Sequence, residues 1–395
     1  MKDKQIADLI KKETARQKKV INLIASENYV SKDILTALGS IFDNKYAEGY
    51  PFARYYGGQE NTDKLETLCQ DRARKLFGLK ESEWHVNVQP LSGSPANLAV
   101  YLGLVPQGGK IMGLPLTSGG HLTHGQKVSI TGKVWQQVPI DVDTKTALID
   151  YAKMKEDAMR EKPALLVVGF TAYPRIVDFR KVREIADACG ALMMVDMSHF
   201  AGLVAGKAYP TPFQYADVVT TTTHKTLRGP RGAMIFAKKG KMIGDKSIAT
   251  LIDKAVFPGL QGGPHLSQIA GIAVALKEND SATFKKYATQ VIKNAQAFAK
   301  RLQELGWKVI SGGTDSHLIL VDTWMDGKGV PGKEAEAKLE AAGIICNKNT
   351  IPGETRSPFD PSGIRLGTPA ETTRGKKEKD FKKIAEKIDK VLRGK

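Results

Sequence analysis

The chain has 395 residues, of which 42% are hydrophobic and 26% are charged, and its formal net charge is +17. This length exceeds what one simple core holds, so we expect two domains with terminal segments. No uninterrupted apolar stretch approaches the roughly 20 residues of a membrane-spanning helix, and the N-terminal segment lacks the apolar run of a secretory signal.

The first 45 residues indicate helices outside the main sheet, which we interpret as an arm that packs on a partner. From about residue 60 to 265, short apolar runs alternate with amphipathic helical stretches. The apolar runs are HVNVQP, KIMGL, ALLVVGF, ALMMVDM, ADVVTTTT and AMIFAKK. This alternation predicts an α/β fold with a mainly parallel sheet that is covered by helices on both faces. Ligands bind such sheets beyond the carboxyl ends of the strands.

Beyond residue 266 the helices become longer, with short strands expected near WKVISGG and HLILVDT. We therefore predict an N-terminal arm at 1–45, a large domain at 46–266 and a smaller α/β domain at 267–395. More than half of the excess positive charge lies in residues 1–19 and 374–395. Apolar residues recur at helical spacing in the second of these segments, so we expect its lysines to form the solvated face of a docked helix. These apolar residues are Phe381, Ile384, Ile388, Val391 and Leu392.

A nucleic-acid surface is the weaker explanation of the charge, because no aromatic residues are interleaved with the basic ones and no known binding motif accompanies them. The three cysteines, Cys69, Cys189 and Cys346, have no paired spacing for a metal site or a disulfide framework. The cytoplasm is therefore the default compartment.

A small-residue turn at Ser92–Gly93–Ser94–Pro95 follows one predicted strand and precedes a helical stretch. Such a turn lets backbone N–H groups and Ser94 approach an anion, and the helix dipole adds attraction. Pro95 suits the first helical turn, which does not need its missing N–H. An ordinary strand-to-helix turn is the equally weighted alternative.

Asp196 ends the run ALMMVDM, so its carboxylate should emerge at the carboxyl edge of the sheet, with His199 three residues later. An acid there can keep a pyridine nitrogen protonated, which makes the ring a better electron sink. The alternative is a structural aspartate that caps the next loop.

Lys225 lies between two strand-like runs, beside His224, Arg228 and Arg231. Cationic neighbours and burial lower the pKa of an amine toward a nucleophilic range. A solvated loop lysine fits less well, because the preceding threonine run is strand-like and uncharged.

Five histidines fall in glycine- or threonine-rich loops, namely His121, His124, His199, His224 and His265. We expect no metal site at GGHLTHG, because no cysteine or acid of suitable spacing accompanies its two histidines. An imidazole stacked on an aromatic cofactor is the better use of such a residue.

The stretch DVVTTTTHKTLRGPRGA closely resembles the cofactor-lysine signature of the serine hydroxymethyltransferases. Further blocks resemble the same family, in family order, from about residue 22 to 370. They are LIASENYVS, NKYAEGYP, RYYGG, SGGHLTHG, VDMSHFAGLVA, FPGLQGGPH, SGGTDSHL and SGIRLGTPA.

The resemblance implies a fold-type-I pyridoxal-phosphate transferase that works as a homodimer with shared active sites. The implied reaction moves the serine hydroxymethyl carbon reversibly to tetrahydrofolate, giving glycine and 5,10-methylenetetrahydrofolate. The implied catalytic residues are Lys225, Glu48, Tyr56, His121, Asp196 and His199. The implied cofactor contacts are Gly93, Ser94, His121, Asp196, His199, Thr222, His224, Lys225 and Arg231, with Tyr46 and Gly263 of the partner subunit.

In the same comparison Lys225 holds the cofactor as a Schiff base, Asp196 pairs with the pyridine nitrogen and His121 stacks on the ring. His199 lies by the phenolic oxygen or by the substrate hydroxyl. Glu48 matches the acid–base carboxylate beside that hydroxyl. The implied substrate contacts are Ser26, Glu48, Tyr56 and Arg365 for L-serine or glycine, and Leu116, Gly120, Leu122 and Asn349 for the folate. The arginine suits a carboxylate because its planar fork binds two oxygens at once.

Five positions depart from the family pattern without removing an implied catalytic role. They are Phe52 for the usual glycine of GYPG, Leu91 for histidine, Pro95 for glutamine, Ser118 for histidine and Ala233 for glycine. Two alternatives stay open. One is a folate-independent pyridoxal-phosphate aldolase acting on threonine or other β-hydroxy amino acids through the same lysine. The other is an RNA-binding protein that has lost catalysis.

Overall fold

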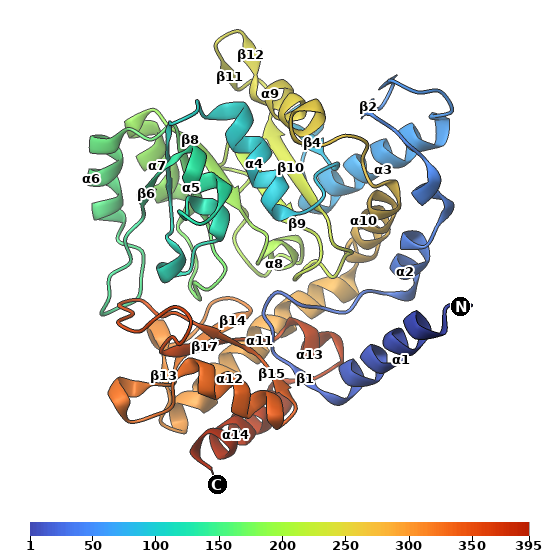
Figure 1. Cartoon of the computed structure of the whole chain (residues 1–395). Helices are drawn as coiled ribbons and strands as arrows, with labels where there is room; N and C mark the ends of the chain where they lie inside the picture. Colours follow the sequence, from blue (N-terminus) through green and yellow to red (C-terminus); the bar gives the residue numbers. More distant parts are fainter. Residues whose placement is uncertain (395) are drawn as a thin grey trace.

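A seven-stranded sheet forms the centre of the larger of two lobes (Figure 1). The computed structural model describes residues 1–394, so Lys395, the last residue of the predicted small domain, lies outside the described residues. The strand order is β4-β10-β9-β8-β7-β5-β6, and β10 alone is antiparallel to its neighbours. The strands are β4 Trp84–Asn87, β5 Lys110–Gly113, β6 Gln136–Pro139, β7 Leu165–Gly169, β8 Leu192–Asp196, β9 Val218–Thr222 and β10 Ala233–Lys238.

Alternate residues of these strands pack against two separate layers of helices. Leu165 and Val167 contact the core formed with α4 and α9, whereas Leu166 and Val168 contact the core on the opposite face. The first layer is α4 Gly93–Leu104 and α9 Ile248–Lys254, and the second is α3 Glu60–Phe77, α6 Tyr151–Glu161, α7 Phe179–Cys189, α8 Ala201–Ala205 and α10 Leu266–Asn279. The predicted doubly covered, mainly parallel sheet is confirmed, and its continuous apolar strands are typical of that arrangement.

All six predicted strands are present, but β6 was not predicted. It is an edge strand in which only Val138 is buried, so it lacks the apolar run that marks the inner strands. Shorter elements complete the lobe, namely the hairpins β2 Gly49–Tyr50 with β3 Ala53–Arg54 and β11 Met242–Ile243 with β12 Lys246–Ser247, the helix α5 Ile130–Val134, the 3-10 turns Leu116–Ser118 and Leu122–His124, and the irregular helical turn Ala255–Leu260.

The smaller lobe is a four-stranded antiparallel sheet with helices packed on it (Figure 1). Its elements are β13 Lys308–Val309, β14 Leu318–Asp322, α12 Gly332–Ala341, β16 Asn347–Asn349, β17 Gly363–Gly367, α13 Pro369–Thr373 and α14 Glu378–Arg393. The prediction that the C-terminal segment is a docked helix is confirmed, because Phe381, Ile384 and Ile388 are buried in this lobe.

Helix α11 Ala282–Glu304 belongs to both lobes. Its residues Phe284 and Val291 are buried in the core of the larger lobe, whereas Phe298 and Leu302 are buried in that of the smaller one. The predicted division at 266/267 coincides with the start of α10, yet α10 packs against α3 and α2 in the larger lobe. Packing around the large sheet therefore continues past that division through Val291, and Leu318 of β14 also contributes to it.

The N-terminal segment forms the helices α1 Lys4–Lys19 and α2 Lys32–Leu38, the 3-10 turn Ile41–Asn44, and a strand that was not predicted, β1 Ile21–Asn22. This strand pairs in parallel with β15 Ile344–Ile345 and anchors the segment to the smaller lobe. Helix α1 buries no side chain. Among residues 1–394, no helix combines the length and the apolar character that crossing a membrane requires.

Candidate active site

A small cavity lies at the carboxyl edge of the large sheet, beyond the ends of β7, β8 and β9. It is lined by Gly93, His121, Phe170, Thr171, Asp196, Ser198, His199, Thr222 and Lys225. Six of these nine are predicted site residues, so the chain brings together groups that lie up to 132 positions apart in sequence. Phe170, Thr171 and Ser198 were not predicted, although each follows the end of β7 or β8, where ligand contacts are expected.

Lys225 lies in the turn between β9 and β10, and its side chain is half-buried at the wall of the cavity. Burial lowers the pKa of its amine to about 8; Asp196 opposes this shift, and Arg365 and Arg231 add to it. Arg228, predicted to be a cationic neighbour, instead places its guanidinium 4.4 Å from the ring centre of Tyr287. Arg365, which the sequence indicated only as a substrate contact, is distant in the chain and was not predicted to be a neighbour of this amine.

Asn28 secures the backbone of this turn. Its Nδ2 donates to the carbonyl of Lys225 at 3.0 Å and to the hydroxyl of Tyr287 at 2.8 Å. The side chain of Thr373 donates to Oδ1 of Asn28 at 2.7 Å. The N-terminal segment and the smaller lobe therefore both help to fix the position of the lysine.

Asp196 ends β8 and is held ionised by donors on several sides. Oδ2 accepts from Nδ2 of Asn97 at 2.9 Å and contacts Nε2 of His124 at 3.3 Å, while Oδ1 accepts from the N–H of Ser198 at 3.0 Å. Burial alone would raise the pKa of this carboxyl, but the His124 hydrogen bond and the Lys225 charge hold it well below its usual range. Neither Asn97 nor His124 was predicted to contact the acid.

His121 is neutral at physiological pH. Burial lowers its pKa to about 4, and the adjacent His124 acts in the same direction. Its Nδ1 lies 2.7 Å from the hydroxyl of Thr123, whose backbone N–H also donates to it at 3.2 Å. The ring is therefore fixed at the wall of the cavity. No group of three or more potential metal ligands occurs among residues 1–394.

His199 forms a stacked pair with His317, which precedes β14 in the smaller lobe. The ring centres are 5.4 Å apart at an interplanar angle of 25°, and Nδ1 of His199 lies 3.2 Å from Nε2 of His317. Burial lowers the pKa of both histidines, that of His317 to about 3. The block SGGTDSHL contains His317, but only tertiary structure reveals its contact with His199.

The predicted anion turn begins α4. A Cβ atom on Gly93 would lie 2.7 Å from Cγ2 of Thr222, so only glycine lets the helix start approach β9 this closely. The N-cap residue, Ser92, makes no side-chain capping bond, which leaves N–H groups of the first turn open to a ligand. Ser94 is the second residue of the helix, and Pro95 is accommodated in its first turn.

Arg365, in β17, is half-buried, and its side-chain hydrogen bonds within residues 1–394 go to uncharged groups. Its Nε donates to Oδ1 of Asn347 at 3.0 Å, and Nη1 donates to the carbonyl of Thr171 at 2.7 Å. Burial lowers the pKa of the guanidinium to about 10. A largely desolvated, still charged arginine is a strong binding group for an external carboxylate.

A second group of predicted residues lies at the surface, and none of its members lines the cavity. The hydroxyls of Tyr46 and Tyr56 each donate to Glu48 at 3.2 Å, and a Cβ on Gly263 would lie 3.3 Å from the Tyr46 ring. Tyr46 and Tyr56 are about half exposed, and the neighbouring aromatic residues Tyr55 and Phe52 are more exposed still, Phe52 at 85%.

The remaining predicted residues are also absent from the cavity wall. Gly120 is buried, Leu116 is half-buried in a 3-10 turn, Leu122 is exposed and Asn349 ends β16. Ser26 is half-buried and Arg231 is exposed. His224 is largely buried, and its Nδ1 has no hydrogen-bond partner in the structure.

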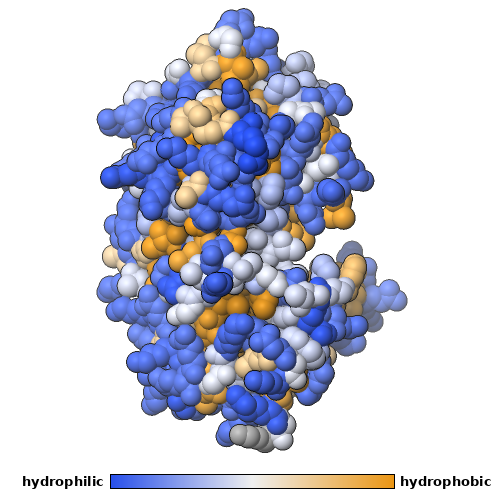
Figure 2. Space-filling model, turned by 90° about the vertical axis from the view of Figure 1, so that its left-hand side faces the viewer, coloured by the Kyte–Doolittle hydropathy of each residue, from blue (hydrophilic) through white to orange (hydrophobic). Residues whose placement is uncertain are grey.

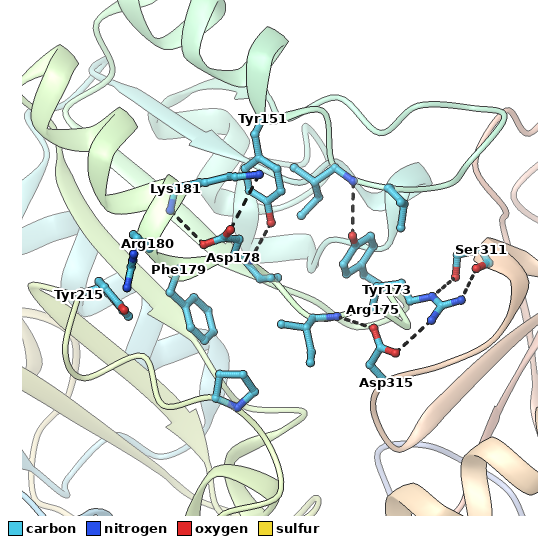
Figure 3. Close-up of a pocket in the computed structure, with 15 residues that line it drawn as sticks. Tyr151, Tyr173, Arg175, Asp178, Phe179, Arg180, Lys181, Tyr215, Ser311 and Asp315 are labelled. Carbon is cyan, nitrogen blue, oxygen red and sulfur yellow. Dashed lines mark hydrogen bonds and ion pairs between the residues drawn. The ribbon is translucent and has the colours of Figure 1, made fainter.

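A larger cavity, of about 860 Å³, lies at the junction of the lobes and shares no lining residue with the cavity at Lys225 (Figure 3). Tyr151, Tyr173, Phe179 and Arg175 line it from the larger lobe, and Asp315 lines it from the smaller one. On the face that forms the left-hand side of the view in Figure 1, hydrophobic side chains gather near the middle of an otherwise largely hydrophilic surface (Figure 2).

Comparison with known proteins gives a consistent result over nearly the whole chain. A family model described as serine hydroxymethyltransferase matches residues 1–388. The serine hydroxymethyltransferase of Desulfotalea psychrophila is 53% identical over 390 residues, which cover 99% of this chain and 88% of the relative. The serine hydroxymethyltransferase of Caenorhabditis briggsae is 52% identical, covering 98% of this chain and 77% of its own. A Schizosaccharomyces pombe protein named "Probable serine hydroxymethyltransferase, cytosolic" is 48% identical, and the match covers 99% of this chain and 85% of that relative. The chain therefore belongs to the serine hydroxymethyltransferase family of fold-type-I, pyridoxal-phosphate-dependent enzymes.

Proposed function

We propose that this chain transfers the hydroxymethyl carbon of L-serine reversibly to tetrahydrofolate, giving glycine and 5,10-methylenetetrahydrofolate. The observation that carries the proposal is the convergence of Lys225, Asp196 and Gly93 on one cavity. Membership of the serine hydroxymethyltransferase family favours this reaction over folate-independent cleavage of β-hydroxy amino acids.

The cavity residues fit pyridoxal phosphate. Lys225 offers an amine with a pKa of about 8 to the aldehyde, and ionised Asp196 offers a partner to the pyridine nitrogen. The open N–H groups at the start of α4, with Gly93 and Ser94, suit the phosphate. His121 provides a flat, neutral wall for the ring, and Thr222, His224 and Arg231 complete the proposed contacts. When bound, pyridoxal phosphate supplies the electron sink for cleavage of the serine Cα–Cβ bond.

We assign the amino-acid carboxylate to Arg365, because its largely desolvated charge is hydrogen-bonded only to uncharged groups among residues 1–394. This arginine fixes the amino acid while His199 and Ser26 act near its hydroxyl. Leu116, Gly120, Leu122 and Asn349 are the proposed folate contacts; the half-buried or exposed side chains of Leu116 and Leu122 suit a flat apolar ligand.

We further propose a homodimer in which Glu48, Tyr46, Tyr56 and Gly263 of the partner subunit complete each cavity. Support comes from their position in one surface group that lies outside the cavity of their own chain. In this arrangement Glu48 exchanges a proton with the serine hydroxyl, oriented by the two tyrosine hydroxyls. The exposed rings of Tyr55 and Phe52 would be covered by the second copy.

We propose the cytoplasm as the compartment. Support comes from the three cysteines, which form no disulfide, and from the name of the Schizosaccharomyces pombe relative. A reducing compartment keeps such thiols free.

The visible absorption spectrum of the purified protein tests the cofactor assignment. We expect a Schiff-base band that borohydride abolishes and that Lys225→Ala lacks. Turnover of L-serine that is strictly dependent on tetrahydrofolate tests the reaction. Threonine cleavage without folate that outpaces serine turnover would replace the proposed reaction with that of an aldolase.

A further inference from the structure

The stacked histidines His199 and His317 share a single proton between them. Nδ1 of His199 and Nε2 of His317 are 3.2 Å apart, which is a hydrogen-bond distance. Both rings are buried and face Lys225 and Arg365, and His199 also faces His121. These cationic and imidazole neighbours favour the neutral form of each ring, so one nitrogen must donate and the other must accept.

The surroundings of His317 decide which nitrogen donates. Its Nδ1 is sealed from solvent without a hydrogen-bond partner among residues 1–394, and the backbone of Ala25 acts on the ring as an acceptor does, raising the pKa of His317 against the effect of burial. A carbonyl oxygen attracts an N–H and repels a nitrogen lone pair, so the proton of His317 belongs on Nδ1. Nε2 of His317 is then an acceptor, and His199 must donate from Nδ1.

The second nitrogen of His199 consequently carries a lone pair. Nε2 of His199 makes no hydrogen bond to any of residues 1–394, and it is not among their sealed polar atoms. His199 lines the cavity, so this lone pair is available to a ligand there. Such a nitrogen accepts a hydroxyl proton but repels an anionic oxygen.

Hydrogen bonds and an ion pair between the two lobes fix the loop that carries His317 (Figure 3). Nη1 of Arg175 bonds Oδ1 of Asp315 at 3.0 Å, and its Nε donates to the hydroxyl of Ser311 at 3.1 Å. The N–H of Ile176 donates to Oδ2 of the same aspartate at 3.3 Å. These contacts keep the His317 ring in a fixed position relative to His199, which belongs to the larger lobe.

We propose that His317 is a positioning residue, which takes the Nδ1 proton of His199 so that Nε2 of His199 accepts the hydroxyl of the bound β-hydroxy amino acid. This inference rests on the proposed function and deepens it. It selects the substrate hydroxyl over the phenolic oxygen as the partner of His199.

Nitrogen-15 NMR of the histidine-labelled full-length enzyme measures the tautomer directly, independently of activity. The chain has seven histidines, and His199→Asn and His317→Gln assign the two signals. We expect His199 in the wild type to be protonated on Nδ1 and unprotonated on Nε2. A proton on Nε2 would overturn the inference.

Two substitutions separate positioning from packing. His317→Leu keeps an apolar ring-sized group but removes the acceptor, whereas His317→Gln returns an amide oxygen to the same place. We expect His317→Leu to lower kcat for serine by about 10-fold, less than the roughly 10²–10⁴-fold contribution of a general acid–base group because His199 itself remains, and His317→Gln to restore most of it. The affinity for glycine, which has no hydroxyl, should stay unchanged.

If His317→Leu weakens glycine binding by the same factor as it lowers kcat for serine, or leaves kcat for serine unchanged, the inference is overturned in favour of a structural role. If His317→Leu fails to fold, the wild-type tautomer and the glutamine variant still decide the matter. Should His199→Asn itself leave serine turnover intact, the proposed role of His199 fails. If that variant is impaired while His317→Leu is not, only the positioning role is lost.

Discussion

Nε2 of His124 lies 3.3 Å from the carboxylate of Asp196, and the backbone decides which atom carries the proton. Nδ1 of the same ring accepts the N–H of His121 at 3.3 Å, so in the neutral imidazole the proton is on Nε2 and points at the acid. The carboxylate is thus stabilised as an anion by a donor that cannot reverse its direction.

Substitution of Asp196 should therefore lower kcat more than substitution of His124. We expect Asp196→Asn to lower kcat at least about 100-fold, as for other lost electrostatic partners in active sites. His124→Leu should lower it by about 10-fold, because the Asn97 hydrogen bond to the acid remains. Steady-state rates with serine and tetrahydrofolate measure both, and equal losses in the two variants would contradict this ranking.

The amine of Lys225 should give apoenzyme reconstitution a distinct pH dependence. An amine attacks an aldehyde only when unprotonated, and burial has lowered the pKa of this amine to about 8. The second-order rate of pyridoxal-phosphate binding to apoenzyme should rise with pH through about 8 and then level off. Stopped-flow absorbance measures this rate. A midpoint near that of free lysine, about 10.4, would show that the amine is not shifted in solution.

The close approach of Gly93 to Thr222 predicts a rescue by a second substitution. A Cβ at position 93 lies 2.7 Å from Cγ2 of Thr222, so Gly93→Ala should displace the start of α4 and weaken cofactor binding by about 10-fold, equivalent to roughly 1.4 kcal/mol. Thr222→Ser removes that methyl group and keeps the hydroxyl, so the double variant should recover much of the affinity. Cofactor titration of the apo forms measures all three, and purely additive effects would exclude the steric explanation.

The hairpin that carries Tyr55 and Tyr56 depends on a buried ion-pair network. Arg54 bonds Asp63 at 2.9 Å and Glu66 at 2.6 Å, and Glu66 is completely buried. Burial raises the pKa of Glu66, while Arg54 lowers it. Arg54→Met should destabilise the fold by about 3–5 kcal/mol, because it leaves a buried charge without its partner.

Arg54→Met combined with Glu66→Gln is the matched control, since it removes both charges of the completely buried pair and leaves only Asp63 of the network. We expect the double variant to be less destabilised than Arg54→Met alone. Urea unfolding followed by far-ultraviolet circular dichroism measures the difference, and a double variant at least as unstable as the single one would argue against the charge explanation.

The sequence predicts the parts of the site that depend on local pattern. Asp196 and the turn at Gly93 each adjoin a contiguous apolar run, and the rule for parallel sheets places both at the same edge. Lys225 follows the buried threonine strand in the same way. For these residues the order of elements along the chain is sufficient.

Contacts between distant segments are not encoded in such local patterns. His199 and His317 are 118 residues apart, and their stacking depends on how the two lobes pack. For the same reason the sequence did not indicate that the guanidinium of Arg228 lies over the Tyr287 ring, or that Arg365 is a neighbour of the Lys225 amine. Edge strand β6 escaped prediction because a strand with one buried residue has almost no hydrophobic signal.

Helix α11 couples the unfolding of the two lobes. One end of this continuous helix completes the core around the large sheet and the other completes the core around the small one, so neither core can melt without exposing apolar residues of the other. We expect a single calorimetric transition for the two lobes, and a fragment cut within α11 should leave both halves unable to fold.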